Sequence, residues 1–276
     1  MDRLELIVFH VGHGLSVALI EKPENYVTLV DLGASSGFTP LKELGLRFKV
    51  KPDILYITHP HADHLDDVET ALDRIFAPLG IHFQDYDWSD VKKRERKELS
   101  YKIDEYRELI ASLPHRAYSG GAHLKSWAYT PENAKKNFGE SSYINNSSLL
   151  LIYTWKGFKV TITGDLETVA IDRMLTEAPV LADVKNTDLL IAPHHGHKSG
   201  FPNTWVQTVG KPYLTLVSAN ESDPHIDKQY DSPKFAHGLT LNGHPQYMIS
   251  TGDSGSIHLT VTFGNNGSQN WNFEYF

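Results

Sequence analysis

The sequence contains no cysteine, which excludes disulfide bonds, thiolate catalysis and metal ligation by thiolates. Any metal in this protein must therefore be bound by His, Asp, Glu or Asn. No stretch approaches 18 consecutive apolar residues, so we expect no membrane span. The first residues, 1–5, lack the basic and then apolar pattern of a secretory leader, and Leu4 already begins an apolar segment. A cytoplasmic location is the expectation.

An excess of basic residues is also lacking. The chain has 26 Lys and Arg against 34 Asp and Glu, a formal net charge of −8. This balance argues against a protein that holds nucleic acid mainly through a basic surface. It does not exclude nucleic acid as a substrate, because bound divalent cations would make the site itself positive. At 276 residues and 40% hydrophobic content, the chain can form one large globular domain or two small ones.

A dense group of possible metal ligands follows an apolar segment near residue 60. Residues 53–57 read as a short buried strand, and residues 59–64 then contain three histidines and an aspartate. His59 and His61, two residues apart, can bind one ion, while Asp63 and His64 can bind a second. Imidazole suits zinc, and carboxylate also tolerates harder ions such as manganese. We therefore predict two divalent ions, Zn or Mn, the arrangement that many phosphate and amide hydrolases use.

The rest of the chain alternates strands and helices in two halves. We expect helices at 65–76 and 168–178, and this order favours two β-sheets packed face to face with helices outside. A helical insertion is expected at about 82–126, with Ser89 capping a helix that contains the basic run 92–97 and continues towards Leu113. The expected strands are Leu4–Phe9, Ser16–Ile20, Tyr26–Asp31, Ile54–Thr58, Ser148–Thr154, Lys159–Thr163, Asp188–Ala192, Tyr213–Val217, Gln246–Ser250 and Ser256–Phe263.

Two more strand ends carry possible ligands. The strand at 159–163 leads into Gly164 and Asp165, whose carboxylate could bridge two cations. The strand at 188–192 leads into His194 and His195, of which one should bind metal while the other orients a ligand or the substrate. Asp165 could equally be a turn residue if it stood alone, but strand ends that converge on one edge favour ligation.

These residues resemble the metallo-β-lactamase superfamily, whose His-x-His-x-Asp-His motif stands here at 59–64. The segment 9–14 is similar to the Asp-Val-Gly-Gln-Gly opening of the hydrolase domain attached to bacterial DNA-uptake competence channels, with His10 and His13 in place of Asp and Gln. Residues 145–151, 163–165 and 193–196 are similar to the later blocks of that branch, which also includes phosphorylcholine esterases. The resemblance implies a four-layer αββα sandwich, a single domain over residues 1–276, and phosphodiester chemistry.

The resemblance also implies a ligand set, with one departure. Most superfamily hydrolases supply a third histidine before the bridging aspartate, and here Asn145 or Asn146 stands in that block. His82, His115 and His123 are the alternative histidines, but none follows a glycine-flanked strand. The first ion would be bound by His59, His61 and Asp165, with water or Asn145 completing the shell. The second would be bound by Asp63, His64, Asp165 and His195.

The resemblance gives roles to residues around the ions. Asp31 is similar to a family aspartate that braces a ligand histidine. Asp63 would also accept a hydrogen bond from the nucleophile, and His194 or His225 would protonate the leaving oxygen. His225 fits the place of the family's Gly-His-Pro motif better than His244, although His225 could also be a solvated loop histidine. The role of His197, where the relatives usually have Ser, stays open.

We therefore predict a metal-dependent phosphodiesterase that uses a metal-bridging hydroxide, with a DNA-degrading nuclease as the specific hypothesis. The alternative is a hydrolase of a small phosphodiester, an ester or a lactone on the same dinuclear site. A flavin-linked diiron oxidoreductase is disfavoured, because such relatives typically have Glu where His61 stands. A non-catalytic scaffold is disfavoured because such proteins usually lose ligands that this chain retains.

Overall fold

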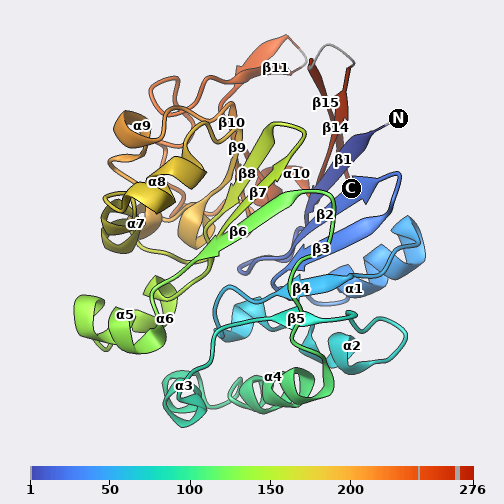
Figure 1. Ribbon diagram of the computed structural model, residues 1–276, viewed down its shortest axis with the longest axis vertical. Coiled ribbons are helices and arrows are strands. Elements are labelled where there is room, and N and C mark those ends of the chain that lie inside the picture. Colours follow the sequence, from blue (N-terminus) through green and yellow to red (C-terminus); the bar gives the residue numbers. More distant parts are fainter. Residues whose placement is uncertain (1, 242, 265–267) are drawn as a thin grey trace. The chain divides into compact units, whose positions relative to one another are not determined.

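The computed structural model describes residues 2–241, 243–264 and 268–276. The chain divides into two compact units, each built around its own main sheet (Figure 1). Unit 1 comprises Met1–Gly121 and Gly255–Phe276, and unit 2 comprises Ala122–Ser254. The prediction of a single domain over residues 1–276 depends on how the two units pack, so it stays a prediction.

Unit 1 contains a seven-stranded sheet in the order β15-β14-β1-β2-β3-β4-β5. Strand β1 pairs antiparallel with β2 on one side and with β14 on the other, whereas β3, β4 and β5 run parallel. The apolar side chains of β1 to β4 are almost completely buried, as their continuous apolar sequences predict. The strands are β1 (Arg3–Val8), β2 (Val17–Lys22), β3 (Tyr26–Val30), β4 (Ile54–Tyr56), β5 (Ile81–His82), β14 (Ile257–Phe263) and β15 (Gln269–Tyr275).

Unit 2 contains a six-stranded sheet in the order β13-β10-β9-β8-β7-β6, of which β8, β9, β10 and β13 run parallel. A two-stranded sheet, β11 (Leu239–Leu241) with β12 (His244–Gln246), completes its strands. Helices and loops of this unit pack on the sheet around the buried side chains of Leu150, Ile171 and Trp205. The main strands are β6 (His123–Trp127), β7 (Leu150–Trp155), β8 (Phe158–Ile162), β9 (Leu189–Ile191), β10 (Leu214–Val217) and β13 (Met248–Ser250).

The helices are short. Unit 1 has α1 (Pro40–Glu43), the π-helix η1 (Leu44–Phe48), the 3₁₀-helix η2 (Ala62–His64), α2 (Val68–Leu72), α3 (Trp88–Arg94) and α4 (Tyr101–Ser112). Unit 2 has α5 (Pro131–Phe138), α6 (Tyr143–Asn146), α7 (Thr168–Met174), α8 (Ala178–Val184), the 3₁₀-helices η3 (Pro193–Gly196) and η4 (Lys198–Gly200), α9 (Trp205–Thr208) and α10 (Thr251–Ser254). Among the described residues, no helix combines the length and the apolar character that crossing a membrane requires.

The predicted strands are present to within a few residues, except that the expected strand 246–250 is divided between β12 and β13. The helices differ more from the expected ones. The helix expected at 65–76 is shorter, because residues 62–64 form η2 and α2 begins only at Val68. The helix expected at 168–178 ends at Met174, and α8 follows with Pro179 in its first turn. In the insertion, Ser89 is not the cap: the side chain of Asp87 accepts hydrogen bonds from the backbone N–H groups of Ser89 and Asp90. The chain then breaks between Arg94 and Tyr101, so the basic run is only partly helical.

The topology brings distant residues to the same edge of each sheet. In unit 1, β3 and β4 are parallel neighbours, so Asp31 after β3 and residues 57–64 after β4 leave the sheet at one edge. In unit 2, β8 and β9 are parallel neighbours, so Asp165 and residues 193–196 also share an edge. Loops at the carboxyl ends of parallel strands are where ligands commonly bind in α/β sheets.

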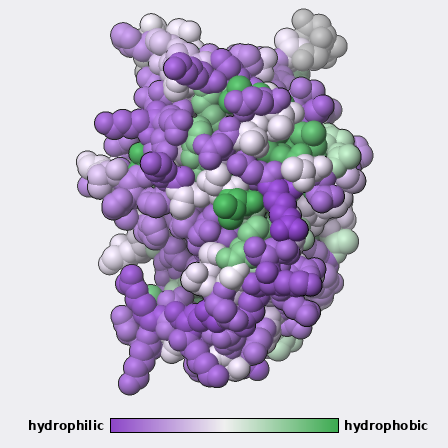
Figure 2. Space-filling view, turned by 90° about the vertical axis from the view of Figure 1, so that its left-hand side faces the viewer, coloured by the Kyte–Doolittle hydropathy of each residue, from purple (hydrophilic) through white to green (hydrophobic). Residues whose placement is uncertain are grey.

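The face drawn in Figure 2 is mainly hydrophilic, with small separate apolar areas. The exposed large hydrophobic side chains come from different elements, including Leu46 in η1, Val169 in α7 and Tyr275 in β15. Single exposed apolar residues of this kind are ordinary on a protein surface.

Candidate metal centre

Two imidazoles after β4 are arranged as ligands of one ion. The Nε2 atom of His59 lies 3.1 Å from the Nδ1 atom of His61. Two nitrogen ligands of a tetrahedral zinc, with bonds of about 2.0–2.1 Å, lie about 3.3 Å apart, so this pair has the spacing that a shared ion requires. His59 is 1% exposed, and its other ring nitrogen lies 3.2 Å from the Thr58 hydroxyl. The sequence prediction that these two histidines face one position is therefore consistent with their geometry.

Asp31 fixes the orientation of His64. Its Oδ2 atom lies 2.7 Å from the Nδ1 atom of His64 and accepts a 2.7 Å hydrogen bond from the Thr58 hydroxyl. Its Oδ1 atom accepts a hydrogen bond from the Thr58 backbone N–H. Burial raises the pKa of the Asp31 carboxyl, while His64 and Thr58 act in the opposite direction. With Nδ1 engaged by the carboxylate, His64 is left with Nε2 as its ligand atom, the usual arrangement of a metal-binding histidine.

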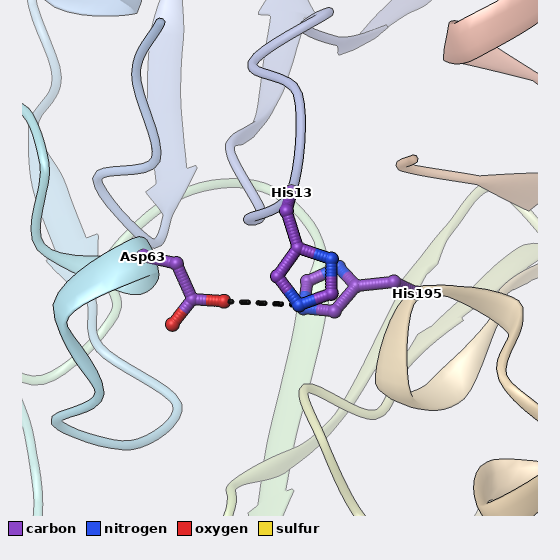
Figure 3. A group of neighbouring side chains, drawn as sticks. All are labelled: His13, Asp63 and His195. Atoms are coloured by element: carbon purple, nitrogen blue, oxygen red, sulfur yellow. Dashed lines mark ion pairs between the residues drawn. The ribbon is translucent and has the colours of Figure 1, made fainter. Parts of the chain in front are cut away.

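Asp63 lies between two imidazoles of unit 1. Its Oδ2 atom is 4.0 Å from the Nε2 atom of His64 and 3.7 Å from the Nε2 atom of His13 (Figure 3). The loop that carries His13 passes close to Asp63, because a Cβ on Gly14 would lie 2.4 Å from the Asp63 carbonyl oxygen. Gly14 also has a φ of +146°, a conformation that favours glycine. No local sequence pattern predicts that His13 approaches the ligand turn.

The insertion supports the same ligand turn. Glu95, at the end of α3, accepts a 3.0 Å hydrogen bond from the backbone N–H of Ala62, between His61 and Asp63. Lys102 of α4, a mostly buried lysine, forms an ion pair with Asp66 just beyond the turn. The insertion therefore stabilises the ligand turn through these two contacts. The sequence patterns did not predict either of them.

In unit 2, Asp165 is buried and held by its backbone. Its N–H donates a 3.2 Å hydrogen bond to the Ser148 hydroxyl, and Asp165 is 4% exposed. Its Oδ1 atom lies 3.4 Å from the Nε2 atom of His195, and its Oδ2 atom lies 4.0 Å from the Nε2 atom of His194. The predicted association of the carboxylate with the histidine pair is present in the structure.

The backbone of the histidine pair is unusual. His194 and His195 both have positive φ angles, 49° and 54°, inside η3, the turn from which His195 is drawn in Figure 3. Each such conformation costs on the order of 1–3 kcal/mol and is concentrated at functional sites. Gly196 follows with a φ of +75°, and a Cβ there would lie 2.8 Å from the side chain of Val217. The strained turn directs both imidazoles to Asp165, which lies across from them on the neighbouring loop.

A row of imidazoles continues from this turn. The Ser199 hydroxyl lies 3.0 Å from the Nδ1 atom of His194 and 2.8 Å from the Nδ1 atom of His197. The ring of His225 follows, 5.8 Å from that of His197 between centroids. Burial lowers the pKa of His197, and the neighbouring His194 and His225 act in the same direction. His197 is therefore part of the row of imidazoles that begins at His194. His225 is exposed and joins this row through the ring of His197.

The structure distinguishes Asn145 from Asn146. The amide of Asn146 donates a 3.0 Å hydrogen bond to the Glu167 carboxylate and accepts one from the Glu167 backbone N–H. The Oδ1 atom of Asn145 is buried and has no hydrogen-bond partner among the described residues. The Asn145 carbonyl accepts a hydrogen bond from the N–H of Ser148, the residue that holds Asp165. Asn145 is thus the better candidate ligand of the two.

The sequence matches no protein-family model and no curated protein sequence. Among solved structures it resembles Igni18, described as a novel metallo hydrolase from the hyperthermophilic archaeon Ignicoccus hospitalis, with a TM-score of 0.50 and 14% identity over 94% of this chain and 100% of that one. It also resembles the CmlA β-hydroxylase E377D mutant, with a TM-score of 0.49 and 13% identity over 80% of this chain, which spans about half (46%) of that one. A hydrolase of the β-lactamase superfamily, AbOPH, gives a TM-score of 0.36 and 16% identity over 58% of this chain and 60% of that one.

The chain has a mixed α/β fold similar to that of Igni18. The predicted α/β class is confirmed by the sheets and helices described above and by the likeness to Igni18. At 14% identity this likeness concerns the fold alone, and the chemistry depends on the residues of this chain.

Proposed function

We propose that this protein is a metal-dependent hydrolase of phosphodiesters, with DNA as the preferred substrate. The observation that carries the proposal is the 3.1 Å separation of the His59 and His61 ring nitrogens, the spacing of two ligands on one ion. The buried, unpartnered Oδ1 of Asn145 and the Asp31-bound tautomer of His64 support it. In this proposal two divalent ions, Zn or Mn, are bound by the ligands predicted from the sequence: His59, His61, Asp63, His64, Asn145, Asp165 and His195.

When bound, such ions activate water and neutralise charge on phosphoryl oxygens. The protein supplies the remaining groups. Asp63 accepts a hydrogen bond from the attacking water, and its turn is held in place by Glu95. His194 is the proposed proton donor to the leaving oxygen through Nε2, and the contact of its Nδ1 with Ser199 orients the ring. His225 is the alternative donor and is exposed enough to contact substrate.

The insertion supports a polyanionic substrate. Within the basic run, Lys92 pairs with Asp104 and Arg94 pairs with Asp90. The other basic residues of the run are exposed and form no ion pair in the part of the chain that the structure describes: Lys93, Arg96 and Lys97. These cations suit the phosphates of a nucleic acid. Because Glu95 lies in the same run and contacts the ligand turn, a strand bound there would be close to the proposed centre.

One observation favours the alternative, a small phosphodiester substrate. Unit 2 contains a cavity of about 510 Å³, within the range of small-molecule sites. The residues that line this cavity come shortly after His197 and His225 in the sequence. They include Asn203, Gln207, Lys228, Lys234 and Phe235. The lysines and amides could bind the anionic and polar groups of a small substrate, and the apolar lining residues could contact its apolar part.

Cleavage assays on a panel of substrates test the proposal. The purified protein is incubated with end-labelled single- and double-stranded DNA, labelled RNA, bis-p-nitrophenyl phosphate and a homoserine lactone, in Mn²⁺, Zn²⁺ or chelator. Asp165→Asn serves as the site variant, and the exposed Asp253→Asn as its control. We expect metal-dependent cleavage of DNA that is lost in Asp165→Asn alone. Turnover of only the small diester would favour the alternative, and turnover of only the lactone would overturn the phosphodiester proposal.

A further inference from the structure

The exposed imidazole of His13 lies beside the proposed centre without an assigned role. His13 follows β1, fifty residues before Asp63 in the sequence, yet its Nε2 atom lies 3.7 Å from the Asp63 Oδ2 atom. The same oxygen lies 4.0 Å from the Nε2 atom of His64. The ring nitrogen of His13 points towards the carboxylate in Figure 3. The Asp63 carboxylate therefore lies near one imidazole nitrogen of each of these two histidines.

The loop of His13 is fixed at both ends. The Phe9 N–H donates a hydrogen bond to the Ser16 carbonyl, and the Gly33 N–H donates one to the Leu15 carbonyl. The His10 N–H donates to the Ser256 hydroxyl at 3.0 Å. Gly14 then packs against the Asp63 carbonyl at a distance that leaves no room for a Cβ. The closeness of His13 to Asp63 is thus built into the backbone.

The distances suit a shared ion. Donor atoms bound to one tetrahedral zinc at about 2.0–2.2 Å are separated by about 3.3–3.6 Å. The His13 side chain is 57% exposed, so a small rotation of its ring is enough to bring Nε2 to that separation from Asp63. The ring of His64 needs to move less, because Asp31 contacts Nδ1 and leaves Nε2 on the side of the ring away from that carboxylate.

We propose that His13 is a further ligand of the ion held by Asp63 and His64. This inference rests on the proposed metal centre and adds to it a residue that the ligand set predicted from the sequence does not contain. The donor set from unit 1 becomes two imidazoles and one carboxylate. Such a set favours zinc over manganese, because imidazole binds borderline ions better than hard ones. His13 thus makes this ion the more zinc-selective of the two.

Calorimetric titration of the metal-free protein with Zn²⁺, and separately with Mn²⁺, tests the inference. The variant is His13→Gln, which keeps a polar side chain of similar length, and the control is His237→Gln, an exposed histidine between α9 and β11. We expect two zinc ions in the wild type, at least a tenfold weaker second zinc in His13→Gln, and a smaller change for manganese. His237→Gln should match the wild type.

Histidine NMR gives a readout of zinc binding on the wild-type protein itself. In ¹⁵N-histidine-labelled wild-type protein, the His13 resonance, assigned by its loss in His13→Gln, should shift at Nε2 as zinc is added. Unchanged zinc affinity in His13→Gln, or an unshifted His13 resonance in protein with two zinc ions bound, would overturn the inference. A wild type that binds no metal would instead overturn the proposed function.

Discussion

Asp31 and His64 form a fully buried carboxylate–imidazole pair, with Oδ2 of the aspartate 2.7 Å from Nδ1 of the histidine. The aspartate follows β3, the histidine is the last residue of η2, and Thr58 completes the contacts of the carboxylate. The pair selects one tautomer of His64, with the proton on Nδ1 and the lone pair on Nε2. Metal binding through His64 therefore depends on a residue 33 positions away in the sequence.

Replacing Asp31 with Asn should weaken metal binding. The amide NH₂ would face Nδ1 of His64, stabilise the opposite tautomer and place a proton on the ligand atom Nε2. Loss of such a supporting contact typically lowers metal affinity by about 10–100-fold. Competition with a chelating dye would measure the affinity, with Asp253→Asn as the control. An Asp31→Asn protein with wild-type affinity would show that His64 is not a ligand.

Adding a methyl group at Gly14 should separate the His13 loop from the ligand turn. The new Cβ would lie 2.4 Å from the carbonyl oxygen of Asp63, so the backbone must shift. We expect Gly14→Ala to lower the free energy of unfolding by about 1–3 kcal/mol and to weaken metal binding. Gly37→Ala is the matched control, because Gly37 also has a positive φ but has no atom within 4 Å of its Cβ position. Equal effects in the two variants would attribute the loss to backbone conformation instead of the close approach.

Removing the unpaired cations of the insertion should impair DNA cleavage selectively. The triple variant Lys93→Gln, Arg96→Gln and Lys97→Gln removes the exposed charges that we assign to phosphate contacts. We expect weaker DNA binding with a shallower salt dependence, and unchanged turnover of bis-p-nitrophenyl phosphate. The control triple, Lys42→Gln, Lys49→Gln and Lys156→Gln, changes the net charge equally at exposed sites elsewhere. Similar DNA binding by both triple variants would contradict a specific role of the insertion.

The raised pKa of Asp67 should make the free energy of unfolding decrease as the pH rises from 4 to 7. Burial raises the pKa of its carboxyl from 3.8 to about 6, and Oδ1 has no hydrogen-bond partner among the described residues. The folded state therefore holds a proton that the unfolded state has lost in this range. The stabilisation is complete below pH 3.8 and disappears as the pH rises through 6, with a magnitude of at most about 3 kcal/mol at 1.36 kcal/mol per pKa unit.

Urea unfolding of Asp67→Asn at pH 4.5 and pH 8 checks this. Asn is neutral at both values, and its carbonyl can still accept the 3.0 Å hydrogen bond from the Leu41 N–H. Relative to the wild type, the variant should be more stable at pH 8 than at pH 4.5. A difference between the two proteins that does not change with pH would contradict the raised pKa.

Much of the fold could be predicted from the sequence, because buried strands have continuous apolar sequences and short strand-end motifs stand out. Residues 54–58 and 159–163 are examples. The resemblance also predicted that Asp31 braces a histidine, and the structure shows its contact with His64. Metal binding by His64 stays a prediction. The helix boundaries in the insertion were wrong, because Asp87 competed with Ser89 as the cap and the mixed charges of 92–97 carry no helical stop signal.

The remaining site contacts depend on tertiary structure. His13 reaches Asp63 because Gly14 allows a close backbone approach, which no local pattern indicates. Glu95 looks like one charge in a solvated run, yet it accepts a hydrogen bond from Ala62. The choice of Asn145 over Asn146 required knowing that Glu167 engages Asn146 on two sides. Each of these contacts joins loops whose separation in sequence hides their proximity.

The most direct measurement is DNA cleavage by chelator-treated protein as Mn²⁺ or Zn²⁺ is added back in known equivalents, with metal content determined on the same samples. The account predicts no cleavage without metal, activity that saturates near two equivalents per chain, and its loss in His61→Gln. A protein that takes up two ions and leaves DNA and small phosphodiesters intact, or that cleaves them equally in chelator, would contradict the account.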